Sequence, residues 1–145
     1  GVVPAVNLPT SLEARHLYDE PSYLYCAAGH PLFTEDDNTL SCADIAQHSA
    51  ISPRYPLPVE ARQAHDALSL RASASDREGA AFLILTGRFI GFLPEHVAAQ
   101  WVAAGKMRAL HANSQHYRIP FVLITRHDRR PNRVVDAFLR LIKSS

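Results

Sequence analysis

Hydrophobic and polar positions alternate in blocks along the chain, and residues 80–101 carry the clearest pattern. A continuous apolar run ends just before Gly87, where a residue without a Cβ suits the left-handed end of a helix. Residues 89–93 form a second apolar run, short enough for a buried strand. Pro94 ends that strand and suits the first turn of another helix. The stretch therefore predicts a helix, a buried strand and a second helix joined by tight turns.

The rest of the chain continues this alternation of short elements. Strands are predicted at residues 1–6, 23–28, 48–52, 67–72, 107–110 and 117–125. Helices are predicted at residues 42–47 with Ser41 as the cap, at 59–66, from Ser73 or Ser75 to Thr86, at 94–105 and from Pro131 onward. The last helix has a predicted buried face of Val134, Val135, Phe138, Leu139 and Ile142. Pro120 places the last strand at a sheet edge or a bend.

This alternation predicts the α/β class, with a mostly parallel sheet that has helices on its faces. Such sheets bind ligands beyond the carboxyl ends of their strands. Two strand exits fit that description, at Pro53-Arg54 and at Pro94-Glu95. The helix that begins at the second exit favours an anionic ligand.

Composition and length narrow the class of protein. A chain of 145 residues with 47% hydrophobic and 20% charged residues has the balance of a globular protein with one core or two small lobes. No apolar run approaches the roughly 18 residues of a membrane span. The start without Met suggests a piece of a longer protein, and no secretory signal is visible. Cys26 and Cys42 are expected to be buried, reduced thiols, which favours the cytoplasm.

Charge is unevenly distributed, although the net charge is only +1. Residues 1–44 carry seven acidic residues and, of Lys and Arg, only Arg15, whereas residues 101–145 are rich in Lys and Arg. The basic end is open to two interpretations, a nucleic-acid patch or a solvated helix face that complements the acidic segment. The second interpretation is favoured.

Motifs for catalysis or metal binding are weak. His111 and His116 are candidate metal ligands, but they have no neighbouring Cys or carboxylate, so surface histidines are favoured and no metal is expected. Cys26 and His30 suggest a Cys–His pair that lacks a third, orienting group. The G-x-S-x-G, P-loop and G-x-G-x-x-G motifs do not occur. No enzymatic activity and no cofactor are therefore predicted.

In their order and spacing, four segments (residues 17–33, 40–51, 83–94 and 121–142) together resemble the LysR-type transcriptional regulators, and the resemblance covers essentially all 145 residues. Residues 17–33 (LYDEPSYLYCAAGHPLF) look like the crossover strand of that family, with its His-Pro-Leu ending at His30-Pro31-Leu32. Residues 40–51 resemble the short helix before the next strand, and residues 121–142 fit the final strand and helix. Residues 83–94 (LILTGRFIGFLP) resemble the helix-to-strand signature, although Arg88-Phe89 stands where many members have a second small residue.

The resemblance implies a two-lobed domain like the type 2 periplasmic binding proteins, with crossover strands between the lobes. Lobe II would be complete at residues 23–118, and lobe I partial, with residues 1–22 as partial lobe I and crossover and residues 119–145 as the return strand and last helix. The implied function is to sense a small-molecule effector and to couple its binding to oligomer geometry and transcription. The alternative is a solute-binding protein or an enzyme lobe of the same fold.

The resemblance also implies a binding site in the cleft between the lobes. The predicted effector contacts in this chain are Ile51, Ser52, Pro53, Arg54 and Phe92. Arg54 could pair with a carboxylate of an anionic effector, or it could be an exposed loop charge, and Phe92 could instead belong to the core. The other implied partners are further copies of the chain and, only through a helix-turn-helix domain that this chain lacks, DNA. No membrane contact is expected.

Overall fold

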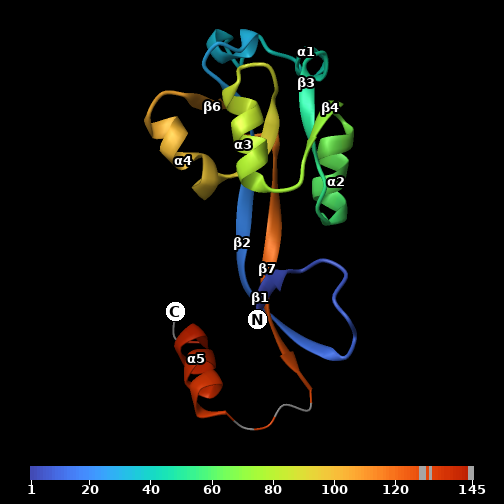
Figure 1. Ribbon diagram of the computed structural model, residues 1–145, viewed down its shortest axis with the longest axis vertical. Coiled ribbons are helices and arrows are strands. Elements are labelled where there is room, and N and C mark those ends of the chain that lie inside the picture. Colours follow the sequence, from blue (N-terminus) through green and yellow to red (C-terminus); the bar gives the residue numbers. More distant parts are fainter. Residues whose placement is uncertain (128–129, 131, 144–145) are drawn as a thin grey trace. The chain divides into compact units, whose positions relative to one another are not determined.

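The computed structural model describes residues 1–127, 130 and 132–143 of the chain, and Figure 1 shows a mixed α/β fold. The strands are β1 (Val2–Pro4), β2 (Leu12–Ala27), β3 (Ser49–Pro53), β4 (Ser69–Ala74), β5 (Gly91–Pro94), β6 (Met107–Ala109) and β7 (His116–Arg126). The helices are α1 (Cys42–Ala46), α2 (Val59–Asp66), α3 (Arg77–Leu85), α4 (Glu95–Ala103) and α5 (Arg133–Lys143), with a short 3-10 helix, η1 (Pro31–Thr34). The predicted α/β class is confirmed. Among the described residues, no helix is both long enough and apolar enough to cross a membrane.

Two sheets organise the strands, and most of their pairs are antiparallel. The larger sheet has the order β1-β7-β2-β5, with β6 also paired to β2, and β1 with β7, β2 with β5 and β2 with β6 all run antiparallel. Strands β3 and β4 form a parallel ladder. The prediction of a mostly parallel sheet is therefore wrong. The reason is that β5 and β6 run back against the long strand β2, which alternation of helices and strands does not reveal.

The chain forms two compact units. Unit 1 contains residues 1–19 and 120–145, and unit 2 contains residues 20–119. Strand β2 begins in unit 1 and ends in unit 2, whereas β7 begins in unit 2 and ends in unit 1. In unit 1, β1 pairs with β7, with Val3 opposite Val122, and the rings of Tyr18 and Phe121 stack with centroids 5.1 Å apart.

The core of unit 2 forms where α3, β5 and α4 meet β2 and β3. Its fully buried side chains include Leu24, Ile84, Ile90 and Leu93. Gly91 packs closely between α3 and β3. A Cβ at this position would be 3.1 Å from Ile51 Cδ1 and 3.2 Å from Ile84 Cδ1, so a larger residue would not fit without a shift of its neighbours. The predicted helix–strand–helix unit at residues 80–101 is confirmed, and Gly87 has a φ of 76° just beyond α3.

Side chains near the helix starts cap α1 and α3, and the cap of α3 differs from the predicted one. Ser41 accepts a hydrogen bond from the amide of Asp44, and Asp44 accepts one from the amide of Ser41, as in a capping box. Helix α3 is capped by Asp76, whose Oδ1 accepts from Gly79 N at 2.6 Å, so the prediction of Ser73 or Ser75 is wrong. Strand β4 extends through Ala74, which moves the start of the helix beyond both serines.

Three further predictions are corrected. The edge position predicted for the strand with Pro120 is wrong, because β7 lies between β1 and β2, whereas the alternative of a bend stays a prediction. The carbonyl of Pro120 accepts a hydrogen bond from Ala5 N. Cys26 is buried as predicted, but Cys42 is exposed at the start of α1. In α5, Val134 and Phe138 are exposed, at 78% and 47%, instead of buried. The side chain of Ile142 lies outside the described residues.

Candidate functional site

The exit of strand β3 forms a small cavity within unit 2 that has both polar and apolar walls. Because β3 and β4 are parallel, their carboxyl ends lie at one edge, where the amide of Arg54 donates to the carbonyl of Ala74 at 2.9 Å. The proline-rich loop that follows turns back to α2. A cavity of about 240 Å³ lies here, lined by Ser52, Pro53, Tyr55, Pro56, Leu57, Arg62, His65, Asp66 and Leu70. The position beyond a strand exit is the one where α/β proteins place ligand contacts.

The structure brings some of the predicted contacts together and separates others. Ser52 and Pro53 line the cavity. Ile51 is buried behind them against Gly91, and Phe92 is buried in contact with the ring of His65. Arg54 is exposed and is not among the lining residues. The role of all five predicted residues as effector contacts stays a prediction.

His65 was missed by sequence reasoning, although it is the buried histidine of this cavity. Its Nδ1 donates to the carbonyl of Ala61 at 2.8 Å, so Nε2 carries the lone pair of the neutral ring. Burial lowers the pKa of His65, which favours that neutral form. The ring lies 4.9 Å from the ring of Phe92 and 5.6 Å from that of Tyr117, measured between centroids. Nothing in the sequence distinguishes His65 from the other histidines except its place on the inner face of α2.

A buried ion pair lies on a different side of unit 2. Arg77, the first residue of α3, donates from Nη2 to Glu20 Oε1 at 2.7 Å and from Nη1 to Glu20 Oε2 at 3.1 Å. The side chain of Glu20 is 5% exposed and that of Arg77 is 31% exposed. His96 Nδ1, at the start of α4, is 3.8 Å from Glu20 Oε2. A carboxylate on β2 therefore holds the first turn of α3, and His96 of α4 lies near it.

Hydroxyl groups accompany this ion pair. Burial raises the pKa of both Tyr55 and Tyr117, and the charges of Glu20 and Arg77 act on both phenols, so the hydroxyls stay protonated. A contact with the side chain of Ser22 offsets part of the effect by which burial raises the pKa of Tyr117, although among the described residues Ser22 Oγ has no hydrogen bond of normal geometry. Ser22 is only 1% exposed. An unpartnered buried hydroxyl is costly, so its presence here requires a reason.

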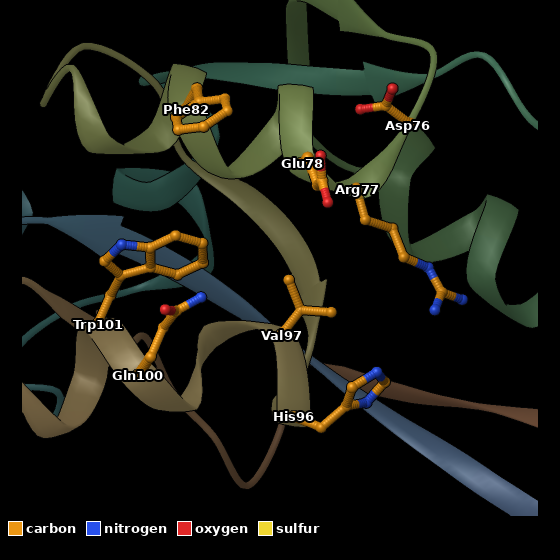
Figure 2. A pocket seen from close by; sticks show the side chains of 8 residues that line it. All are labelled: Asp76, Arg77, Glu78, Phe82, His96, Val97, Gln100 and Trp101. Carbon is orange, nitrogen blue, oxygen red and sulfur yellow. The ribbon is translucent and has the colours of Figure 1, made fainter.

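A wider groove lies between α3 and α4, and Figure 2 shows its lining. Phe82, Val97 and Trp101 provide its apolar surface, whereas Arg77 and His96 extend from the two helices toward β2. Its volume is about 690 Å³, larger than that of the cavity at the β3 exit. Its Asp76 and Arg77 are already engaged, as the cap of α3 and as the partner of Glu20.

The metal and nucleophile candidates from the sequence make other interactions among the described residues. In the part of the chain that the structure describes, no three His, Cys, Asp or Glu side chains are grouped to hold a metal. His111 Nε2 instead hydrogen-bonds to the carbonyl of Leu40. Burial raises the pKa of Cys26 to about 11, against the opposing effect of Arg108, so the nucleophilic thiolate is disfavoured.

Comparisons with known proteins agree on one family. The sequence profile described as the LysR substrate binding domain matches residues 1–145. The HTH-type transcriptional activator BauR of Pseudomonas aeruginosa is 48% identical over 145 residues, which are 100% of this chain and 48% of BauR. The chain thus spans about half the length of this curated relative.

Solved structures show the same fold at low identity. The effector domain of the regulator AmpR from Pseudomonas aeruginosa matches 99% of this chain and 69% of its own, with a TM-score of 0.72 and 15% identity. The Synechocystis CcmR regulatory domain, solved in complex with 2-PG, matches 99% of this chain and 72% of its own, with a TM-score of 0.76 and 12% identity. The CrgA regulatory domain from Neisseria meningitidis matches 99% of this chain and 74% of its own, with a TM-score of 0.69 and 21% identity.

Proposed function

The chain belongs to the LysR substrate binding domain family, and from this we propose that it senses a small-molecule effector for a longer, LysR-type transcriptional regulator. The observation that carries the proposal is the match of the family profile to every residue of the chain. The family and the relative BauR are transcriptional regulators, so the chain is not assigned to the enzymes. The solute-binding and enzyme alternatives have no specific observation in their favour.

The proposed effector contacts begin with the cavity at the β3 exit. Ser52 and Pro53 line it, Ile51 and Phe92 support it from the core, and Arg54 would meet the ligand from the solvent side. The neutral Nε2 of His65 adds a hydrogen-bond acceptor to this set. A pocket that combines apolar walls with a few polar groups is typical of small-molecule sites.

The proposed coupling follows from the two crossing strands. We infer that residues 23–118 are lobe II and that residues 1–22 and 119–145 belong to lobe I, since β2 and β7 each pass from one compact unit to the other. An effector that binds one arrangement of the lobes more tightly than another shifts the population toward it. In the whole protein, this shift would reach DNA through a helix-turn-helix domain and through a homo-oligomer. Such a regulator would act in the cytoplasm.

The proposal is tested on the full-length regulator by thermal unfolding in the presence of a panel of small metabolites, because a ligand of the folded state raises the midpoint. Compounds that raise the midpoint should also change transcription from a reporter. Ser52→Leu, which fills the cavity, should weaken both effects. The matched control is Ser73→Leu, because Ser73 pairs with Ser52 in the ladder, is exposed and does not line the cavity. A panel that leaves midpoint and transcription unchanged would refute the proposal.

A further inference from the structure

A further cavity of unit 2 lies between helix α4 and the strands β2 and β6, and its volume is about 520 Å³. A cavity of this size is within the range of small-molecule sites. Tyr23 and Tyr25 line it from β2, because residues two apart on a strand face the same side of the sheet. Glu95, Val102, Asn113 and four alanines complete the lining. The short side chains of the alanines leave this space open.

The two tyrosine rings of this cavity form a corner. Their centroids are 6.5 Å apart, and the angle between their planes is 85°. Tyr23 is half-buried, whereas Tyr25 is only 3% exposed. The face of a tyrosine ring carries partial negative charge and attracts a cation that lies within about 6 Å of its centroid. The rings therefore favour a cation in this cavity over an anion.

The hydroxyl of Tyr25 is an unused polar group of the cavity. It makes no hydrogen bond with the described residues, although Tyr25 is almost fully buried. Burial raises the pKa of Tyr25 to about 12, with further contributions from Glu95 and Tyr23, so the phenol stays protonated and neutral. A buried polar group normally has a hydrogen-bond partner. The lone pairs of this oxygen can accept an N–H from a ligand.

Glu95, the first residue of α4, provides the charge of the cavity. Among the described residues that line it, none of the others is Asp, Glu, Lys, Arg or His. The carboxylate of Glu95 is exposed and has no ion-pair or hydrogen-bond partner in the described part of the chain. The ring of His116 lies 6.2 Å from that of Tyr23, between centroids, but His116 does not line the cavity. Glu95 would therefore repel an anionic ligand and attract a cation.

We propose that this cavity binds a small organic ammonium ion. Glu95 pairs with the positive charge, the ring of Tyr23 contacts the cation, and the hydroxyl oxygen of Tyr25 accepts an N–H where the ion has one. This cavity and the cavity at the β3 exit share no lining residue, so the site is separate from the proposed effector contacts there. The ammonium site goes beyond the proposed sensing function and does not depend on it.

Calorimetric titration of the full-length regulator, at neutral pH and low ionic strength, tests the proposal with two pairs of probes of matched size. Choline is compared with the neutral alcohol in which a carbon atom replaces its nitrogen, and propylammonium is compared with propanol. We expect each cation to bind roughly tenfold more tightly than its neutral partner. Added NaCl should weaken the binding of both cations, because Glu95 is exposed. Equal affinity within both pairs, or no binding of either cation, would overturn the proposal and leave the sensing function intact.

A substitution of the carboxylate tests the ion pair. Glu95→Gln removes the charge and should weaken the binding of both cations by roughly threefold to fivefold. Glu60→Gln is the matched control, because Glu60 is also an exposed acid in the first turn of a helix, α2, and does not line the cavity. Unchanged cation affinity in Glu95→Gln, or an equal loss in Glu60→Gln, would contradict the proposal.

Substitutions at two further positions test where the cation lies. Ala99→Leu fills the cavity from α4 and should abolish cation binding, whereas Gln100→Leu, at the adjacent exposed residue outside this cavity, should preserve it. Tyr23→Phe keeps the ring and should bind the cations as the wild type does, whereas Tyr23→Leu should bind them roughly fivefold more weakly. Circular dichroism verifies that each variant is folded. Undiminished cation binding in Ala99→Leu would place the ion elsewhere and overturn the proposal.

Discussion

The ring of His65 packs against the ring of Phe92, with the two centroids 4.9 Å apart, so a titratable side chain forms part of the core of unit 2. Burial lowers the pKa of His65 below its ordinary value of 6.5, against the weaker opposing effects of the Ala61 carbonyl and Asp66. Below pH 6.5 the imidazole of His65 binds a proton in the unfolded chain, whereas burial in the folded protein disfavours the protonated ring. The contribution of neutral His65 to the free energy of unfolding should therefore be fully present above pH 6.5. It should be lost as the pH falls from 6.5 through the folded-state pKa of His65.

Urea unfolding of the full-length protein from about pH 8 to about pH 5.5 measures this dependence. His65→Phe keeps an aromatic ring and removes the titration, so the decline toward acid should become shallower. Some decline should remain, because burial and the neighbouring His48 also lower the pKa of His30. An equally steep decline in the variant would contradict the assignment to His65.

The Glu20–Arg77 pair should contribute to stability in a way that a double substitution reveals. Arg77→Gln leaves the carboxylate of Glu20, which is 5% exposed, without its partner and should cost about 2–3 kcal/mol in the free energy of unfolding. Glu20→Gln/Arg77→Gln should cost less than Arg77→Gln, since two neutral amides replace the stranded charge. Chemical denaturation measures both. Equal or greater destabilisation in the double variant would mean that Glu20 is not stranded by the single change.

Two matched substitutions can test which residue caps α3. Asp76→Ala removes the acceptor for Gly79 N and should destabilise the protein by about 1 kcal/mol. Ser75→Ala alters the exposed residue next to it and should stay within about 0.5 kcal/mol of the wild type. Asp76→Asn should keep most of the stability, because an amide oxygen also caps a helix. If Ser75→Ala proved the more costly change, the cap would be misassigned.

Gly91 should tolerate no larger side chain without compensation. Gly91→Ala places a Cβ within 3.2 Å of the Cδ1 atoms of Ile51 and Ile84 and should cost about 1–2 kcal/mol by overpacking. Ile84→Val removes one of those Cδ1 atoms, so the two substitutions together should cost less than the sum of their separate effects. Urea unfolding of the two single variants and the double variant gives the coupling directly. If the costs of the two substitutions simply add, the backbone, and not the isoleucine side chains, moves to accommodate the new Cβ.

Helix α5 should drive self-association of the isolated chain. Val134 and Phe138 expose apolar surface on a helix that also carries basic residues. Sedimentation of the chain across micromolar concentrations should show species larger than a monomer, and Val134→Lys/Phe138→Lys should shift them toward the monomer. Val59→Lys, an equally drastic change at an exposed residue of α2, should leave the distribution unchanged. A clean monomer for the wild-type chain would refute the prediction.

The sequence predicted those features that depend on neighbouring residues. The cap at Ser41 and the helix end at Gly87 are set by short-range chemistry, and both are confirmed. The start of α3 was missed because Ser73, Ser75 and Asp76 are all competent caps, and the length of β4 decides among them. That length depends on pairing with β3, which composition does not show.

The polar chemistry of unit 2 could not be predicted for a similar reason. Glu20 and Arg77 are 57 positions apart, and each alone has the pattern of an ordinary surface charge. His65 follows Ala61 by four residues on one face of α2, but its burial depends on Phe92 and Tyr117 from distant strands. The family resemblance pointed to the exit of β3, and the structure places a cavity at that exit.

The passage of β2 and β7 between the two units also sets an order of assembly. Unit 1 is built from both ends of the chain, so β1 cannot meet β7 until all of unit 2 has been synthesised. Unit 2 is continuous in sequence, and its collapse brings the two remote segments together and lowers the entropy cost of their closure. Of the two units, unit 2 should thus form before unit 1, and a ligand present during translation would meet unit 2 before unit 1 is complete.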